Sequence, residues 1–319
     1  MSPGVDQFDL LAVGELNPDL ILTGIHDNEP RLGVEQEFGG YRLTLGSSTA
    51  ICCVLTQRLG LRTAMSACVG DDDYGRFCRQ ALETERVDTR MVVTQPGVET
   101  GLTVCLPYPS DRLLMTCKGA MALDPSAALS DELLRTARHL HVGSFFLQTA
   151  LRPRLAGLFA RARSYELTTS LDTGWDPDQN WLDDDLRAVL AQTSILLPNA
   201  MEFERLSGET DVARGVASLR ALGVGAVVLK RGAAGAFYAG PDDAVGHSGF
   251  EISPRDTTGA GDAFNAGYLM SMLKGAPVAD RLAFGNACGA LTASTVGGTG
   301  GVFSADQVHA FIAERATAG

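Results

Sequence analysis

Short apolar runs alternate with helix-like segments along most of this sequence, and the alternation limits the folds open to the chain. The apolar runs are typical of buried strands and cover residues 9–13, 62–69, 139–142, 167–171, 195–197 and 226–229. The segments between them have the pattern of helices and cover residues 49–59, 74–85, 151–163, 183–191 and 212–222. Strands that alternate with helices favour a parallel sheet covered by helices on both faces. The sequence therefore predicts an α/β fold.

Two regions interrupt this alternation. Residues 21–45 form an extended stretch punctuated by Gly, Asn and Pro. Residues 100–107 and 112–117 are strand-like and are separated by a turn-like link at 108–111, which is typical of a hairpin. We expect these segments to form a small antiparallel sheet inserted into the α/β body. The last third of the chain predicts helices at residues 260–273, 278–294 and 304–315.

Charge and composition exclude several classes of protein. The chain of 319 residues carries 38 Asp and Glu against 26 Lys and Arg, a net charge of −12. Sequence-independent binding to nucleic acid or to an anionic membrane needs a basic surface, so neither is expected as a partner. No apolar run approaches the roughly 20 residues that span a bilayer, and the first residues lack the basic start of a signal peptide. We therefore expect a cytoplasmic location.

The seven cysteines are an odd number and show no CxxC spacing. This favours reduced, buried thiols over a disulfide framework or a zinc site. His139 and His141 share one face of a predicted strand, but no third ligand accompanies them.

The segment DTTGAGDAFNAG at residues 256–267 carries the clearest chemical signal. Small residues let the backbone approach a ligand closely, and a helical pattern begins at once. The first amides of a helix lack partners within it and lie at the positive end of its dipole, which suits phosphate. We expect such an anion hole at Gly259, Ala260 and Gly261. Asp262 beside it is either a helix residue stabilised by the dipole or a base that accepts a hydroxyl proton.

Other phosphate and hydrolase motifs are missing. The sequence has no GxxxxGK[ST] loop, no GxGxxG after the first strand and no GxSxG elbow. A P-loop enzyme, a dinucleotide-binding fold and an α/β-hydrolase are therefore not expected.

Asp19 and Glu202 each allow two interpretations from the residues alone. Asp19 follows Pro18 at a strand end, where it either caps a turn or accepts hydrogen bonds from vicinal hydroxyls. Glu202 lies at a helix start, where negative charge is ordinary.

Several segments in order resemble the ribokinase (PfkB) family of carbohydrate kinases, and they span nearly the whole chain. DTTGAGDAFNAGYL is similar to the C-terminal hallmark of that family. The other matching segments are ELNPDLIL at 15–22, LGSSTAICCVLTQRLG at 45–60, VGDDDYG at 69–75, LLPNAMEFERLSG at 196–208, VLKRGAAGAF at 228–237 and FGNACGAL at 284–291. The resemblance implies a single domain over residues 1–319, a Rossmann-like three-layer α/β/α sandwich. It also implies a β-sheet lid built from about residues 21–45 and 97–121.

The resemblance also implies roles for individual residues. The activity would be ATP-dependent phosphorylation of a sugar hydroxyl, with Asp262 as base and Gly259, Ala260 and Gly261 as anion hole. The positions matching the sugar site are Asn17, Asp19, Gly46, Ser47 and Ser48. The positions matching the nucleotide site are Asn199, Glu202, Lys230, Gly232, Gly235 and Asn286. Asn199 and Glu202 would also influence Mg²⁺, partly through water, and Asp256 and Thr258 match a site for a monovalent cation such as K⁺.

The chain departs from the family pattern at the start of the substrate helix. A Gly-Gly pair is Gly46-Ser47 here, a Lys of ribokinases proper is Ser48, and a common Asn is Ile51. The changes at Ser48 and Ile51 remove polar groups that bond sugar hydroxyls, so we expect an acceptor other than ribose itself.

Three alternatives remain open from the sequence. A nucleoside acceptor would need a slot for its base, which Phe145 and Phe146 can supply. A phosphorylated sugar would need cations near the lid, and the available residues are Arg31, Arg42, Arg112 and Lys118. A non-catalytic sugar or nucleotide sensor on a kinase fold is the third.

The hairpin also predicts an assembly. With period two, one strand places Leu102, Val104 and Leu106 on one face, and the other places Leu113, Met115 and Cys117 together. A lid covers only one of its faces with its own body, so an exposed apolar face predicts a homodimer in which two lids pack together.

Overall fold

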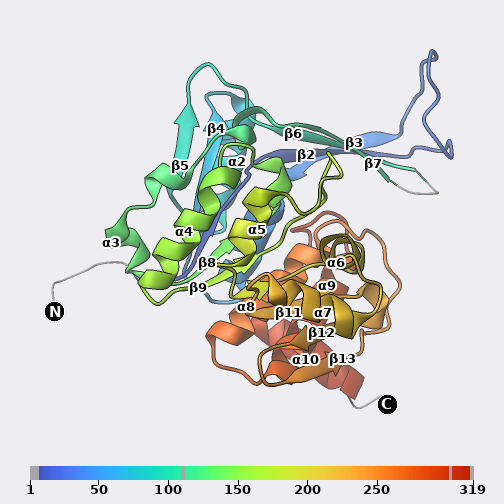
Figure 1. The fold of residues 1–319 in the computed structure, drawn as a ribbon. Helices are drawn as coiled ribbons and strands as arrows, with labels where there is room; N and C mark the ends of the chain where they lie inside the picture. The colour runs from blue at the N-terminus through green and yellow to red at the C-terminus, as the bar shows by residue number, and fades with distance from the viewer. Residues whose placement is uncertain (1–6, 109–111, 302–303, 317–319) are drawn as a thin grey trace.

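The computed structural model describes residues 7–108, 112–301 and 304–316. Its main sheet runs in the order β13-β12-β11-β10-β9-β8-β1-β4-β5 (Figure 1). The strands from β11 to β5 are parallel, whereas β12 and β13 are antiparallel additions at one edge. The bounds are β1 Phe8–Val13, β4 Thr63–Gly70, β5 Asp88–Gln95, β8 Ala137–Val142, β9 Thr168–Leu171, β10 Ile195–Leu196, β11 Ala226–Lys230, β12 Ala236–Ala239 and β13 Ala244–His247.

Helices cover both faces of this sheet. One face carries α3 Asp131–Leu134, α4 Arg152–Ser164, α5 Asp184–Leu190, α6 Ala200–Ser207 and α7 Val212–Ala221. The other carries α1 Ser48–Arg58, α2 Asp73–Thr84, α8 Ala260–Leu273, α9 Val278–Ala293 and α10 Ala305–Ala316. The predicted three-layer α/β fold is therefore confirmed, and the predicted helices and strands match the observed bounds within two residues.

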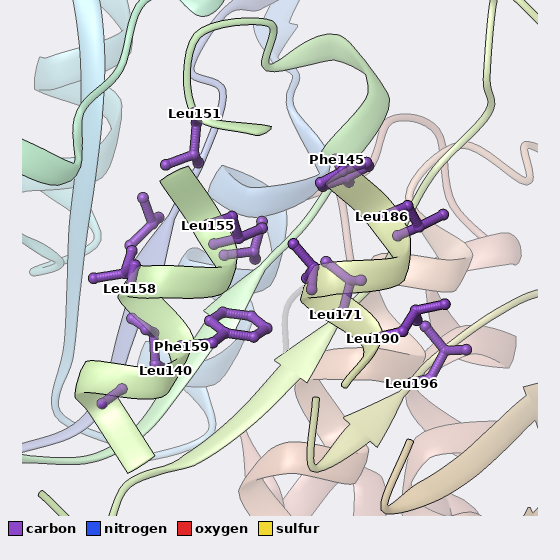
Figure 2. Packing of buried hydrophobic residues seen from close by; sticks show 14 of the residues in the cluster. Leu140, Phe145, Leu151, Leu155, Leu158, Phe159, Leu171, Leu186, Leu190 and Leu196 are labelled. Atoms are coloured by element: carbon purple, nitrogen blue, oxygen red, sulfur yellow. The ribbon is translucent and has the colours of Figure 1, made fainter. Parts of the chain in front are cut away.

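Alternate residues of the strands point toward the two helical layers and form the buried core on each face of the sheet. Leu140, Leu171 and Leu196 point toward α4 and α5, where they pack against Leu155 and Leu190 (Figure 2). Strand residues of the opposite parity, such as Leu10 and Val228, belong to the core under α1 and α8. Central strands such as β1, β4 and β11 are buried on both faces and therefore appear as continuous, mainly apolar runs in the sequence.

A second, smaller sheet has the order β3-β2-β6-β7 and extends to one side of the body (Figure 1). Its strands are β2 Pro18–Thr23, β3 Gly40–Leu45, β6 Leu102–Pro107 and β7 Arg112–Cys117. The expectation of an antiparallel sheet is wrong for one pair, because β2 and β6 are parallel. Each of them follows a strand of the parallel main sheet, β1 or β5, so both leave the body in the same direction. Of the predicted turn at 108–111, residues 109–111 lie outside the described residues.

Asp72 ties the base of the smaller sheet to the body. Its carboxylate caps α2 by accepting from Gly75 N at 2.7 Å. It also accepts from the backbone N and the hydroxyl of Thr100, each at 2.7 Å. The crossing from β5 to β6 is therefore fixed by one side chain.

Two buried histidines lie in the middle of the main sheet. His139 contacts Thr168 Oγ1 at 2.6 Å through Nδ1 and Ser170 Oγ at 2.7 Å through Nε2. His141 contacts the same Ser170 oxygen at 2.7 Å through Nδ1. Burial lowers the pKa of His139 to about 3 and that of His141 to about 4, so both rings are neutral at pH 7.

All seven cysteines are free thiols, and only Cys117 is exposed. Within the described part of the chain, no helix has the length and apolar character needed to cross a membrane.

Candidate active site

Polar side chains gather where the parallel strands of the main sheet end, the usual ligand edge of an open α/β sheet. Glu15 follows β1, Asp172 follows β9, and Lys230 ends β11. Asp262 reaches the same edge from the first turn of α8. All four are largely or wholly buried, so their charges act on one another strongly.

The predicted anion hole has the backbone geometry that its glycines allow. Gly259 is the N-cap of α8 with φ of 73°, a left-handed conformation that favours glycine. A β-carbon there would lie 2.5 Å from Gly298 Cα, so the loop at 297–300 also excludes a side chain. The helix begins at Ala260, and its first amides have no acceptors within the helix. This end of α8 therefore suits a phosphoryl group.

Asp262 is held by a side-chain hydrogen bond from Ser48. Ser48 Oγ, at the start of α1, donates to Asp262 Oδ1 at 2.5 Å. Burial raises the pKa of Asp262 to about 6, and Asp172 adds to the rise, whereas the bond from Ser48 and the charge of Lys230 oppose it. A carboxylate with this pKa is ionised at pH 7 and accepts a proton more readily than an ordinary aspartate.

Asp19 lies at the start of β2, on the face of the smaller sheet that looks toward the body. Asn17 Nδ2 lies 3.3 Å from both Asp19 Oδ1 and Thr103 Oγ1. A β-carbon on Gly46 would lie 2.1 Å from Asp19 Oδ1, so glycine makes room for this carboxylate. Burial and the charge of Asp262 raise the pKa of Asp19 to about 7, so the two carboxylates act on each other electrostatically.

Glu15 is a site residue that sequence reasoning did not single out. Its buried carboxylate accepts from Thr49 Oγ1 at 2.7 Å and from Thr49 N at 3.3 Å. Ser47, with φ of 70°, donates from its hydroxyl to the Glu15 carbonyl and accepts from Ala50 N at 3.1 Å. The available signal was a charged residue two positions beyond a buried strand, which is where polar side chains gather in such sheets.

Asp172 and Asn265 were also missed, and they bond with the predicted Lys230 or with each other beside the anion hole. Lys230 Nζ donates to Asp172 Oδ2 at 2.6 Å, and Asn265 Nδ2 donates to the same oxygen at 2.6 Å. Burial alone would lower the pKa of Lys230, but the charges of Asp172 and Glu202 outweigh it and keep the lysine protonated. A β-carbon on Gly261 would lie 3.6 Å from Nζ, so this ammonium group adjoins the anion hole. Asp172 directly follows a predicted strand, which was the signal for it.

Asn199 and Glu202 form a capping box at the start of α6. Asn199 N donates to Glu202 Oε2, and Glu202 N donates to Asn199 Oδ1, both at 2.9 Å. The helix-start interpretation of Glu202 is thus confirmed, but the residue is buried and faces the site. Burial, together with the charge of Asp172, raises the pKa of Glu202 to about 7.

The donor set at this edge suits Mg²⁺ held mainly by other ligands. No group of three or more His, Cys, Asp or Glu side chains that could hold a metal occurs among the described residues. Mg²⁺ usually keeps several waters and takes one or two carboxylates together with substrate phosphates. Glu202, a buried carboxylate that interacts electrostatically with Asp172 and Lys230, fits that arrangement as a single protein carboxylate.

The residues predicted for the nucleotide site lie around the β11–β12 turn. Gly232 and Gly235 have φ of 55° and 85°, and a β-carbon on Gly235 would lie 2.1 Å from His247 O. Asn286 of α9 donates from Nδ2 to the carbonyl oxygens of His247 and Ser248, each at 3.4 Å. The turn, the segment after β13 and α9 therefore form one wall of the site.

Asp256 and Thr258 fix the approach to the anion hole. Asp256 accepts from Thr258 N and from Gly297 N, each at 2.9 Å. Burial alone would raise the pKa of Asp256, but these two backbone bonds outweigh it and lower the pKa. Arg112, at the start of β7, lies 3.4 Å from Thr258 Oγ1 and links the smaller sheet to this loop.

The proposed aromatic slot for a nucleobase is wrong for Phe145 and Phe146. Each is only 1% exposed, and both belong to the core under α4 and α5. Phe146 packs edge-to-face on Trp181 with centroids 5.5 Å apart. Their aromatic faces are therefore not available to a ligand.

Comparisons with known proteins find similarity over nearly the whole chain. The profile described as "pfkB family carbohydrate kinase" matches residues 8–303. An ATP-dependent ribose-1-phosphate kinase from Halopiger xanaduensis is 29% identical over 309 residues, covering 96% of this chain and 98% of its own. A ribokinase from Haemophilus influenzae is 23% identical, covering 95% of this chain and 98% of its own.

Solved structures share the fold. An E. coli protein described as ribokinase II, solved with ATP and Mg²⁺, superposes with a TM-score of 0.84 at 23% identity, covering 96% of this chain and 99% of its own. The Arabidopsis thaliana ribokinase complexed with ribose and ATP gives a TM-score of 0.83 at 20% identity, with the same coverage.

Proposed function

Because the chain belongs to the pfkB family of carbohydrate kinases, and is therefore a phosphotransferase that acts on hydroxyl groups, we propose that it transfers the γ-phosphoryl group of ATP to a small phosphorylated or unphosphorylated sugar. The observation that carries the proposal is the position of Asp262. This carboxylate, with its pKa raised to about 6, lies in the first turn of α8 beside the anion hole. A base and an anion hole at one point suit an acceptor hydroxyl that meets a transferring phosphoryl group.

In this mechanism Asp19 accepts hydrogen bonds from acceptor hydroxyls and orients the sugar. Asp262 takes the proton of the reacting hydroxyl through its oxygen not engaged by Ser48. The amides at Gly259, Ala260 and Gly261 stabilise negative charge on the transferring group, and Lys230 adds positive charge beside them. Phosphoryl transfer requires mainly such positioning and charge stabilisation.

The nucleotide would lie along Gly232, Gly235 and Asn286. Mg²⁺ bound to its phosphates would neutralise part of their charge, with Asn199 and Glu202 acting on it partly through water. Asp256 and Thr258 would shape a neighbouring site for a monovalent cation such as K⁺. Activity in potassium, sodium and choline chloride at equal ionic strength tests that part of the proposal.

The acceptor most consistent with the cation distribution is a phosphorylated sugar. A cavity of about 420 Å³ near the anion-hole loop is lined by Arg112 and Arg255, together with Tyr108 and Asp256. The charge of Arg112 opposes the rise in the pKa of Asp19, so its guanidinium acts on the residue proposed to bind the acceptor. Guanidinium groups bind phosphate with two parallel hydrogen bonds. The relative named ribose-1-phosphate kinase supports the same choice.

The smaller sheet, which contains β2, β3, β6 and β7, is proposed to act as the lid of a single domain. Asp19 and Thr103 lie on its inner face, where a closed lid would exclude water from the phosphoryl group. Its outer face carries Leu20, Leu43, Val104 and Met115 in register across the four strands.

We propose that two copies of the chain pack through this outer face. Tyr41 and Met115 are 71% and 60% exposed, and Leu43 and Leu113 are also exposed. A contiguous apolar face of this kind is typical of an interface, and a twofold axis is the commonest way to bury one.

A coupled assay of ADP release tests the proposed function. The panel would contain pentoses, hexoses, sugar acids, nucleosides and their 1- and 5-phosphates, each with MgATP. We expect turnover with a phosphorylated sugar and loss of that turnover in Arg112→Gln, with turnover on neutral sugars changed less. Binding of sugars or ATP with no ADP release from any acceptor would instead identify a non-catalytic sensor.

A further inference from the structure

A second cavity lies at the opposite edge of the main sheet, away from the residues assigned to catalysis. It has a volume of about 300 Å³, at the small end of the range for metabolite sites. Its lining comes from the amino ends of three parallel strands. These residues are Thr168, the first residue of β9, Ser194, which precedes β10, and Ala226, the first residue of β11. Tyr268 of α8 and Arg281 of α9 close it from the helical layer.

The cavity carries an unsatisfied polar group. The side chain of Tyr268 is fully buried, and its hydroxyl has no hydrogen-bond acceptor among the described residues, although the guanidinium of Arg281 approaches it as a donor. Burial raises the pKa of Tyr268 to about 12, so the hydroxyl stays protonated and able to donate. A buried donor left without an acceptor costs free energy, which a ligand oxygen would recover.

The charged groups that line the cavity are both cationic. Arg281 is anchored by donation from Nε to Ala276 O at 2.6 Å, and its guanidinium lies near the Tyr268 hydroxyl. Arg163, at the end of α4, is the other charged lining residue, and none of the described lining residues is a carboxylate. The nearby acidic residues are Asp242 and Asp243, which both act on Tyr238 at the cavity wall, and Asp243 also acts on Tyr268.

We propose that this cavity is a binding site for a small phosphate-bearing metabolite. Arg281 and Arg163 would hold the phosphate oxygens, Tyr268 would donate a further hydrogen bond, and the remaining space would take a small polar body. The cavity and the proposed catalytic site lie at opposite ends of the parallel strands. Ala226 and Lys230 are four residues apart on β11, or about 13 Å.

The position lets the proposed ligand bind without competing with the substrates. Strands β9 and β11 run from the cavity to Asp172 and Lys230, and α8 runs from Tyr268 back to Asp262 over about 9 Å. A ligand that changes the position of α8 or of these strands acts on the ion pair and the base without entering their site. The proposal does not depend on the identity of the acceptor or on the kinase reaction itself.

Calorimetric titration with inorganic phosphate tests the site in the full chain. The catalytic site would first be saturated with a non-hydrolysable ATP analogue, Mg²⁺ and, where known, the acceptor. We expect one phosphate to bind under these conditions, and Arg281→Gln to weaken it about tenfold or more, as loss of a charged hydrogen bond does. Arg220→Gln, near the cavity wall but not in its lining, should stay within about twofold of the wild type. Ribose 5-phosphate and ribose titrated in parallel show whether the sugar body or the phosphate is recognised.

Tyr268→Phe separates a binding role from a packing role and covers the case in which Arg281→Gln does not fold. Because the hydroxyl has no acceptor among the described residues, its removal should leave the melting temperature without phosphate unchanged or higher. The rise in melting temperature on adding phosphate should shrink relative to the wild type. Equal phosphate affinity in the wild type and both variants, or no binding once the catalytic site is filled, would overturn the proposal.

Discussion

The carboxylate proposed as the catalytic base is positioned by a residue from another helix. Asp262 depends on the hydrogen bond from Ser48, and the two residues lie 214 positions apart in the chain. Asp262→Asn keeps the shape of the side chain but removes the base. We expect kcat to fall by about 10²- to 10⁴-fold with little change in the KM for ATP.

Steady-state kinetics on the purified variant checks this expectation, with Asp211→Asn at the N-cap of α7 as a control that should remain fully active. Turnover within a few-fold of the wild type would remove Asp262 from the role of base.

The pH dependence of the reaction should report the same residue. Since the base works only when ionised and its pKa is about 6, kcat/KM should rise with pH through about 6 and level off above it. The hydrogen bond from Ser48 lowers this pKa, so Ser48→Ala should move the rising limb to higher pH. Ser48→Thr, which keeps a hydroxyl, should restore it. A uniform loss of activity at all pH values would show that Ser48 acts only on the fold.

Gly46 gives a test of the acceptor side. A β-carbon there would lie 2.1 to 2.8 Å from three atoms of the Asp19 carboxyl group, so Gly46→Ala must displace that carboxylate. We expect the KM for the acceptor to rise about tenfold or more, with the KM for ATP unchanged. Gly157→Ala, where a β-carbon meets nothing within 4 Å, is the matched control. Unchanged acceptor kinetics in Gly46→Ala would mean that Asp19 does not bind the acceptor.

At the scale of the element, α6 combines a structural and a proposed functional role in one turn. Glu202→Gln keeps an oxygen that can accept from Asn199 N, so the capping box and the fold should survive. The charge is lost, so the Mg²⁺ concentration for half-maximal activity should rise several-fold. Glu204→Gln, on the exposed side of the same helix, should leave the Mg²⁺ titration unchanged. A Glu202→Gln titration that overlays the wild type would limit Glu202 to capping.

The strands that could be predicted from the sequence are those whose apolar pattern follows from burial alone. Strands such as β1 and β11 are buried on both faces and therefore appear as unbroken apolar runs. Strand β5 lies at the sheet edge, is partly exposed and contains Asp88 and Arg90, so it gave no such run. The direction of β6 relative to β2 depends on the directions of β5 and β1, the main-sheet strands that precede them in the chain. No local sequence pattern gives those directions.

The candidate site, like the fold, could be predicted only in part from the sequence. Asn17, Asp19, Gly46 and Asp262 were predicted from the resemblance to the family's motifs, and in the structure Gly46 packs on Asp19 and the charge of Asp262 acts on Asp19. Glu15, Asp172 and Asn265 were missed because their roles arise from contacts such as Asp172 with Lys230, 58 positions away. Phe145 and Phe146 show the opposite error, since an aromatic pair after a strand looks the same in the sequence whether it is buried or open.

At the scale of the whole molecule, the outer face of the smaller sheet predicts assembly. Met115→Asp places a charge in the middle of that face and should leave the protein at the mass of one chain in light scattering at micromolar concentration. The wild type should have twice that mass. Leu32→Asp is the matched control, because Leu32 is 97% exposed and lies outside the strands of this sheet. A wild-type protein that stays at the mass of one chain with acceptor and MgATP would contradict the dimer.

The paired histidines in the main sheet have a consequence for where hydrogen atoms lie. Ser170 has one hydroxyl hydrogen and contacts a ring nitrogen of each histidine, so when it donates to one ring it accepts from the other. Two neutral rings joined in this way must share one tautomer, both protonated at Nδ1 or both at Nε2. Nε2 of His141 has no hydrogen-bond partner among the described residues, and a buried N–H without an acceptor is costlier than a bare lone pair. Both rings therefore carry their hydrogen on Nδ1, and Thr168 accepts at the far end of a row of bonds that all point the same way.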